Sequence, residues 1–204
     1  MALGVEKTVR ALLFAASAAL IAAYSALHPA VLEQPYRSVF PLEIKYFCAP
    51  VRLPHIELVD QYGRQVGFPP PGVFVLSFGY THCPDVCPLT FRVLNQTQKL
   101  LHLSVYIVTV DPAGDTPERL RIYAEANHYN FTFLTGQPDA LREVWNAMGV
   151  YVQEAQTQGG YVIYHSVVIA LVVNGTAVRE IDGLPDPTSI ANFFTNSSAC
   201  TRTS

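Results

Sequence analysis

A nearly unbroken apolar run, "VFVLSFGY" at residues 73–80, sets limits on the fold of this chain. It follows "PPPG", a combination that breaks regular structure. A strand with one face in water alternates polar and apolar residues, whereas a strand covered by helices on both faces is apolar throughout. The run therefore predicts an interior strand of an α/β protein.

Strand-like and helix-like segments alternate along the rest of the chain. The expected order is a strand pair at 55–68 with a turn at Tyr62-Gly63, the strand at 73–80, a helix at 89–103, a strand at 104–111, a helix at 115–127, a short strand at 131–134, a helix at 137–149, a loop at 155–164 leading into a strand at 161–173, a turn at Asn174-Gly175 with a partner strand at 176–181, and a helix at 187–194. This order predicts an α/β sandwich with crossover helices and an antiparallel hairpin at one side, as in a thioredoxin-like fold. Such a fold places the first strand-to-helix turn, here "THCPDVCP", at its functional edge.

The N-terminal part carries no formally charged residue from Ala11 to Leu32. At about 1.5 Å per helical residue, a segment of this length covers the hydrocarbon core of a bilayer. Lys7 and Arg10 precede it, so the positive-inside rule leaves residues 1–10 in the cytoplasm. A cleaved signal peptide is the alternative, although Tyr24 does not suit a cleavage site. Both interpretations place the rest of the chain on the extracytoplasmic side of the cell membrane.

The expected organisation is a transmembrane anchor at 11–32, a Pro-rich linker at 33–53, one globular domain at 54–196 and a tail at 197–204. The net charge of -3, with 14% charged residues, provides no basic stripe. We therefore expect a membrane attachment through the N-terminal helix and no nucleic-acid partner.

The turn "THCPDVCP" places Cys83 and Cys87 four residues apart. If a helix starts near Pro84, Cys83 is its N-cap and Cys87 lies one turn further on, so that backbone amides and the helix dipole favour thiolate at both. A reactive pair is expected, suited to redox chemistry or metal binding. An inert disulfide is the alternative, but closing so short a loop stabilises little.

A metal site needs further ligands from elsewhere in the fold. His165 begins a strongly apolar strand, in the region where a thioredoxin fold brings a proline loop against the active-site helix, and no proline lies between Pro138 and Pro185. Zinc would call for a fourth ligand, whereas two thiolates and one imidazole suit a soft ion such as Cu(I). His165 is therefore the candidate third ligand.

Four motifs in order, "FGYTHCPDVCP", "VDPAGDTPERL", "FTFLTG" and "YHSVVIALV", resemble the signatures of the Sco/SenC family of membrane-anchored copper-binding proteins, over residues 54–195. The resemblance implies a thioredoxin-like fold and copper, as Cu(I) or Cu(II), bound by Cys83, Cys87 and His165, with Asp85 as a modulator. It also implies delivery of that copper to the binuclear copper centre of cytochrome oxidase subunit II.

Two other functions stay open. Cys83 and Cys87 could act as the catalytic pair of a thiol-disulfide oxidoreductase that keeps the cysteines of the oxidase copper site reduced; otherwise no conventional enzyme is expected. A copper sensor that signals to a membrane partner is the third hypothesis.

Several residues around the motifs have plainer roles. Ala113-Gly114 stands where the family pattern has larger, charged residues. Asp111 and Asp115 are expected to be turn and cap residues. His82 is expected beside the site or in solvent. Aromatic residues near the motifs could shield the site or pack in the core: Phe78, Tyr80, Tyr161 and Tyr164.

Cys48 and Cys200 bracket the expected domain. Outside the cytoplasm a disulfide persists, and assigning the other two cysteines to copper leaves this pair. Domain termini often lie close together, so a bridge between them is a further expectation.

Overall fold

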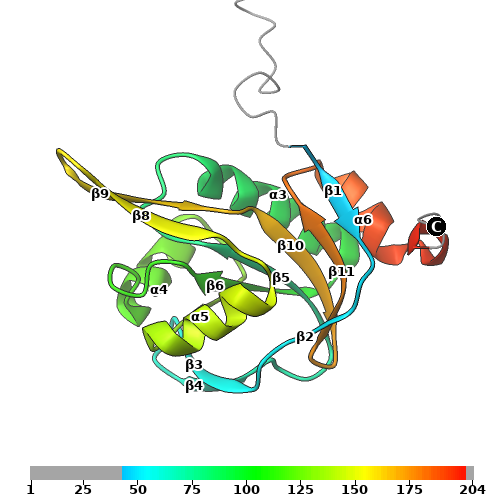
Figure 1. The fold of residues 1–204 in the computed structure, drawn as a ribbon, viewed down its shortest axis with the longest axis horizontal. Coiled ribbons are helices and arrows are strands. Elements are labelled where there is room, and N and C mark those ends of the chain that lie inside the picture. Colours follow the sequence, from blue (N-terminus) through cyan, green and yellow to red (C-terminus); the bar gives the residue numbers. More distant parts are fainter. Residues whose placement is uncertain (1–42, 201–204) are drawn as a thin grey trace, which may run out of the picture. The chain divides into compact units, whose positions relative to one another are not determined.

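A parallel sheet forms the centre of the domain. The computed structural model describes residues 43–200, drawn in colour in Figure 1. Strands β5 (Val73–Gly79), β6 (Ser104–Thr109) and β7 (Thr132–Thr135) lie side by side and run parallel. The apolar run at 73–80 is thus an interior strand, as predicted.

Antiparallel pairs extend this sheet on both sides. The hairpin of β10 (Val168–Val173) and β11 (Thr176–Asp182) lies beside β5. The pair of β3 (Ile56–Asp60) and β4 (Gln65–Phe68) lies beside β7. The complete strand order is β1-β11-β10-β5-β6-β7-β3-β4, with β2 also on β11. The α/β sandwich expected from the sequence is confirmed.

Two short strands precede β3. Strands β1 (Lys45–Phe47) and β2 (Val51–Arg52), which lie within the expected linker at 33–53, both pair with β11. The segment at 11–32 lies outside the described residues. Within residues 43–200, every helix is too short or too polar to cross a bilayer.

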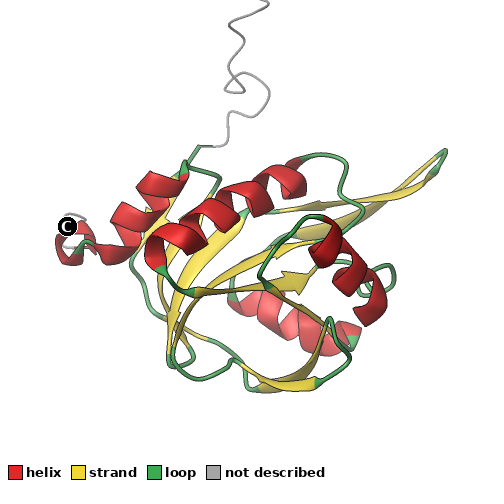
Figure 2. Cartoon of the chain, turned by 180° about the vertical axis from the view of Figure 1, so that it is seen from behind, coloured by secondary structure: helices red, strands yellow, loops and turns green. Residues whose placement is uncertain are grey.

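Four helices cover the two faces of the sheet. Helices α3 (Val86–Leu101) and α4 (Pro117–Ala126) connect β5 to β6 and β6 to β7. Because both crossovers are right-handed and advance in the same direction, both helices lie on one face, together with α6 (Pro187–Thr195). Helix α5 (Pro138–Ala147) covers the other face (Figure 2). Thr116, whose side chain accepts a hydrogen bond from the Arg119 amide, caps α4.

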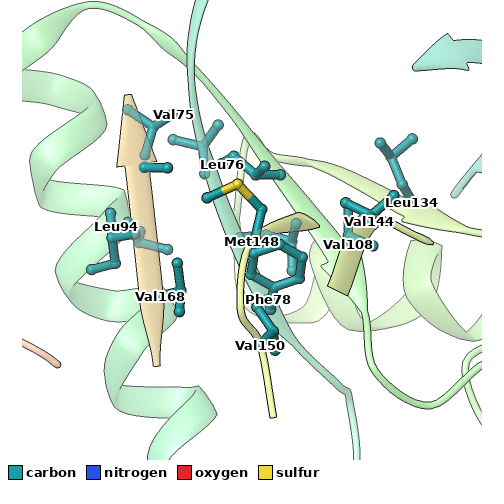
Figure 3. Packing of buried hydrophobic residues seen from close by; sticks show 14 of the residues in the cluster. Val75, Leu76, Phe78, Leu94, Val108, Leu134, Val144, Met148, Val150 and Val168 are labelled. Carbon is teal, nitrogen blue, oxygen red and sulfur yellow. The ribbon is translucent and has the colours of Figure 1, made fainter. Parts of the chain in front are cut away.

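The core lies on both sides of β5. Leu94 of α3 packs against one face of the sheet, and Val144 and Met148 pack against the other (Figure 3). This explains why Leu76 and Phe78, with their neighbours in β5, are buried without alternation. Helices on both faces leave no side of the strand in water.

The structure of residues 151–173 differs from the sequence-based expectation, because part of this segment forms a projecting hairpin. The expected loop at 155–164 is instead strand β8 (Val152–Thr157), a tight turn and strand β9 (Gly160–His165), a separate two-stranded sheet. The strand expected at 161–173 is therefore interrupted at residues 166–167 and divided between two sheets. No residue of β8 is fully buried, so its sequence carries no hydrophobic period from which a strand could be predicted. Figure 1 shows the hairpin extending away from the body of the domain.

Candidate metal centre

Sheet topology brings three distant segments to one edge. In the parallel pair, Gly79 of β5 lies opposite Thr109 of β6, so the loops that follow both strands leave from the same edge. Strand β10 runs antiparallel to β5, with Ile169 opposite Ser77. The residues before β10 therefore lie beside the residues after β5. This places the end of β9 next to the cysteine motif.

The cysteine motif surrounds the start of α3. The helix begins at Val86, with Asp85 as its N-cap, so the prediction that Cys83 is the cap is wrong. The backbone amide of Cys87 donates a hydrogen bond to the Cys83 sulfur at 3.3 Å. The sulfur thus accepts from one of the amides that a helix start leaves without a partner. Asp85 is exposed and its side chain makes no cap hydrogen bond.

His165 presents one ring nitrogen to the cysteines. Its Nε2 lies 3.2 Å from the Sγ of Cys87, and its Nδ1 lies 2.9 Å from the carbonyl oxygen of Ser166. Because a carbonyl oxygen only accepts hydrogen bonds, Nδ1 carries the proton of the neutral ring. The lone pair of Nε2 then faces the sulfur, which is the tautomer that a metal ligand requires.

The three predicted ligands come together. The two sulfurs and a ring nitrogen of His165 all lie within 4.8 Å of one another. Cys83 and Cys87 are buried and not joined by a disulfide, and His165 is half-buried. Two sulfurs and an imidazole form a donor set for a soft transition-metal ion.

The two thiols differ in acidity. The hydrogen bond from the Cys87 side chain lowers the pKa of the Cys83 thiol, in opposition to burial. Burial raises the pKa of the Cys87 thiol, and the neighbouring Cys83 sulfur raises it further. Of the two thiols, Cys83 is therefore the one that ionises first.

Tyr80 connects β9 to the end of β5. Its hydroxyl accepts a hydrogen bond from the Ile163 amide at 3.0 Å, and its ring meets the His165 ring edge-on, with centroids 6.1 Å apart. Burial raises the pKa of Tyr80 to about 12, so the hydroxyl stays neutral. The sequence-based expectation of a buried aromatic residue at the site is met by Tyr80, whereas Tyr164 is 58% exposed and Phe78 lies in the core.

Asp115 has a role that local patterns do not predict. Its carboxylate is fully buried and accepts hydrogen bonds from the hydroxyls of Thr81 and Thr109, each at 2.6 Å. Burial raises the pKa of Asp115, while these hydrogen bonds oppose the rise. Because Thr116 caps α4, the prediction of Asp115 as a cap is wrong. Its contact with Thr81, 34 residues away, instead holds the loop that leads to Cys83.

Asp111 acts as a turn residue, as predicted, and has a further contact. One carboxylate oxygen accepts from the Gly114 amide at 2.9 Å, and the other accepts from the Tyr161 hydroxyl at 2.8 Å. The exposed His82 lies near Asp111 and Asp115, as a residue beside the site rather than a member of the Cys-Cys-His group. The histidines without companion ligands are exposed: His55, His102 and His128.

The remaining cysteines form the expected disulfide. Cys48 and Cys200 are bridged, with their Cα atoms 5.5 Å apart, and the two residues are 152 positions apart in sequence. The bridge joins the start of the described domain to the short helix η2 (Ser197–Cys200) at its end.

Comparisons with known proteins agree on one family. Residues 54–196 match the family model described as SCO1/SenC. A curated protein of Stutzerimonas stutzeri, named "Putative copper-binding protein", is 32% identical over 148 residues, which cover 65% of this chain and 72% of the relative. The chain spans about half of two further relatives, 47% and 49% of their lengths.

Solved structures share the thioredoxin-like α/β fold. The solution structure of apo Sco1 from Thermus thermophilus is 31% identical, with a TM-score of 0.57, over 71% of this chain and 86% of that one. The structure of Bradyrhizobium japonicum ScoI with copper bound is 26% identical, with a TM-score of 0.59, over 71% of this chain and 95% of that one.

Proposed function

The chain belongs to the SCO1/SenC family, and from this premise we propose that it is a copper chaperone for cytochrome oxidase subunit II. The family handles copper and takes part in cytochrome oxidase assembly. Copper is thus the cargo, and delivery to the binuclear copper centre of subunit II is the specific step proposed for this chain.

The convergence of Cys83, Cys87 and His165 carries this proposal. Two sulfurs and an imidazole nitrogen within 4.8 Å of one another form a soft donor set, which favours Cu(I). The proton on Nδ1 of His165 leaves Nε2 free to bind the ion. The donors fit copper without any large rearrangement of the fold.

The same geometry suits transfer as well as binding. Within residues 43–200 the site offers three protein donors, so an incoming thiolate or imidazole of the recipient could bind copper before the chaperone's ligands leave. His165 is half-buried, so the site can be reached from solvent on its side. Binding displaces the proton of the Cys87 thiol, so copper affinity decreases as the pH falls.

Thiol-disulfide exchange is the second candidate function. The buried Cys83 and Cys87 form no disulfide and the pKa of the Cys83 thiol is lowered, which suits reduction of a target disulfide. Cys83 would attack the target, and Cys87 would then release it. Two electrons and the thiol proton pass to the target's sulfurs, and a Cys83–Cys87 disulfide remains.

The proposed setting is the extracytoplasmic face of a membrane. Residues 11–32 would anchor the chain, with residues 1–10 in the cytoplasm. The domain at 54–196 would then face the soluble part of subunit II. A protease-protection assay on intact cells tests this topology, because an outward-facing domain is cleaved by added protease.

Replacement of His165 separates the two functions. In a strain lacking the wild-type gene, His165→Ala should abolish oxidase assembly and weaken Cu(I) binding well beyond the roughly 10- to 100-fold that loss of a ligand-orienting group costs. Reduction of a model disulfide by the same variant should persist. His82→Ala is the matched control, because His82 is an exposed histidine next to Cys83 and outside the three-ligand group.

Two other outcomes would reject one or both of these functions. If oxidase assembly survives in His165→Ala and is lost only when Cys83 or Cys87 is replaced, copper delivery is rejected and the reductase function is favoured. If assembly proceeds normally after deletion of the whole gene, both functions are rejected.

A further inference from the structure

The hairpin that carries His165 has few connections to the domain. Strands β8 and β9 pair only with each other, outside the main sheet. Among residues 43–200, three side-chain hydrogen bonds join this hairpin to other elements. They link Ile163 to Tyr80, Tyr161 to Asp111, and His165 to Cys87. Apart from the packing of the buried Ile163 in the core, the position of His165 therefore depends on a small number of contacts.

Tyr161 makes the outermost of these three contacts. Side chains two apart in a strand share a face, so Tyr161, Ile163 and His165 all point to the same side of β9. The Tyr161 hydroxyl donates to the Asp111 carboxylate at 2.8 Å. Asp111 is itself buried and held in place by the Gly114 amide. The contact joins the far part of the hairpin to the loop after β6.

Gly114 leaves the space for this contact. A Cβ atom added at Gly114 would lie 2.2 Å from the Asp111 Oδ2 atom and 2.7 Å from the Tyr161 hydroxyl. These are the two atoms that form the hydrogen bond, and both distances are far below van der Waals contact. The backbone at Gly114 does not require positive φ, so the missing side chain, rather than backbone freedom, is what the site uses.

We propose that Tyr161, Asp111 and Gly114 form a latch that holds the hairpin closed and so keeps His165 against the cysteines. The purpose that we give to this latch rests on the proposed copper function. The contact between Tyr161 and Asp111 itself does not depend on that function. In the closed state His165 completes the donor set. When the Tyr161 hydroxyl leaves Asp111, the hairpin can swing outward and carry the Nε2 atom away from the ion, and copper is then held by the two sulfurs alone.

The latch sets the rate at which copper leaves. A hydrogen bond to a charged group changes a two-state equilibrium by about tenfold to a hundredfold, and partial exposure of Tyr161, at 39%, places this one near the lower value. Tyr161 and Gly114 are positioning residues, because neither touches the ion. Loss of either should raise the open fraction by about tenfold.

The first experiment measures the latch without copper. In the full-length protein, hydrogen exchange at the Ile163 amide reports hairpin opening, because that amide is bonded to Tyr80 only when the hairpin is closed. Exchange should be about tenfold faster in Tyr161→Phe and in Gly114→Ala, and the double variant should be no faster than either single one. Tyr164→Phe is the control, because it removes a hydroxyl from the opposite face of the same strand.

Unchanged exchange in Tyr161→Phe, or equal acceleration in Tyr164→Phe, overturns the latch. Unchanged exchange in Gly114→Ala overturns the role of Gly114. Additive effects in the double variant show that the two residues do not act through one contact, which also overturns the proposal.

The second experiment adds the metal. Cu(II) loaded onto the full-length protein is removed by excess chelator while the thiolate-to-copper absorption band is followed. Both single variants should lose copper about tenfold faster than wild type, and their absorption bands should shift as the imidazole is lost. Faster amide exchange with unchanged copper loss overturns the link to the metal. Failure of wild type to bind copper rejects the proposed function, while the exchange experiment still decides on the latch.

Discussion

The Sγ atom of Cys87 lies 3.2 Å from the Nε2 atom of His165, although 78 positions separate the two residues in the chain. The contact exists because β10 runs antiparallel to β5, so the chain before β10 returns to the edge where β5 ends. The carbonyl of Ser166 fixes which ring nitrogen faces the sulfur. Two thiol groups with opposite pKa shifts and one imidazole thus share a partly buried site.

Thiol labelling should distinguish the two cysteines. We expect iodoacetamide to modify Cys83, which is 8% exposed and has a lowered pKa, at least about tenfold faster than Cys87, which is 1% exposed and has a raised pKa. Between pH 8 and pH 6 the rate at Cys83 should fall less than in urea-unfolded protein, where each pH unit removes about nine-tenths of the thiolate. Mass spectrometry of the labelled peptides measures both rates.

Cys87→Ala is the informative control for this labelling. It removes the hydrogen bond that contributes most to the lowered pKa of Cys83. The labelling rate of Cys83 should then fall between pH 8 and pH 6 as steeply as in unfolded protein. Faster labelling of Cys87 than of Cys83 in the native wild type would contradict the opposite pKa shifts of the two thiols.

Gly79→Ala should destabilise the domain next to the cysteine motif. An added Cβ would lie 2.7 Å from the Phe91 ring, which is fully buried among the rings of Tyr123, Tyr129 and Phe133. Because that ring cannot move freely, we expect the free energy of unfolding to fall by about 1 to 3 kcal/mol. Urea unfolding followed by circular dichroism measures the change.

Gly159→Ala is the matched substitution for this test. An added Cβ there meets no atom within 4 Å and the backbone does not need positive φ, so stability should be unchanged or slightly raised. Equal losses in the two variants would show that steric contact with Phe91 is not the cause.

Asp60→Asn should make the free energy of unfolding less dependent on pH in the acid range. Burial opposes ionisation of Asp60, but hydrogen bonds from the Arg64 side chain and from the Arg64 and Tyr62 amides outweigh it and lower the pKa of the carboxyl. A lowered folded-state pKa contributes stability that is complete above the unfolded value of about 3.9 and is lost as the pH falls through the folded value. At pH 7 we expect the substitution to cost about 1 to 3 kcal/mol.

Asp139→Asn controls for the general effect of losing an Asp–Arg pair. Asp139 pairs with Arg142, but both side chains are largely exposed, so the cost should stay below about 1 kcal/mol. Thermal unfolding of both variants from pH 2 to pH 7 tests the contrast. Parallel pH profiles for wild type and Asp60→Asn would rule out the proposed linkage.

Removal of the disulfide should lower stability without disturbing the site. Replacement of both Cys48 and Cys200 by serine releases a constraint between residues 152 positions apart, and we expect a loss of about 2 to 5 kcal/mol in the free energy of unfolding. The labelling rate of Cys83 in the native state should not change. A loss below about 0.5 kcal/mol would mean that the two ends stay docked without the bridge.

Local patterns in the sequence predicted the interior strands and the helix starts well. The apolar run of β5 and the Thr116-Pro117 start of α4 depend only on residues within one strand or one turn. The cysteine pair was recognised for the same reason, because four positions along a helix start bring two side chains together. Even there, the predicted cap was wrong, because the helix begins at Val86 and its N-cap is Asp85 rather than Cys83.

The β8–β9 hairpin is a feature that local sequence patterns did not predict. Strand β8 has no fully buried residue, so apolar spacing gave no signal there, and only its pairing with β9 makes it a strand. The buried partners of Asp115 were missed for a related reason, because Thr81 lies 34 positions away and nothing in the local sequence indicates a partner at that distance.

The sequence by itself determined the α/β class, the order of the elements other than β1, β2 and β8, the cysteine pair and the histidine to test as its partner. The tertiary structure alone decided how near His165 comes to Cys87, which tautomer faces the sulfur, and how the empty space at Gly114 admits the Tyr161–Asp111 contact. The physical reason is the distance along the chain over which each kind of interaction acts. Backbone propensity and hydrophobic period act over a few residues, whereas these contacts join residues up to 78 positions apart and exist only once the sheet has packed.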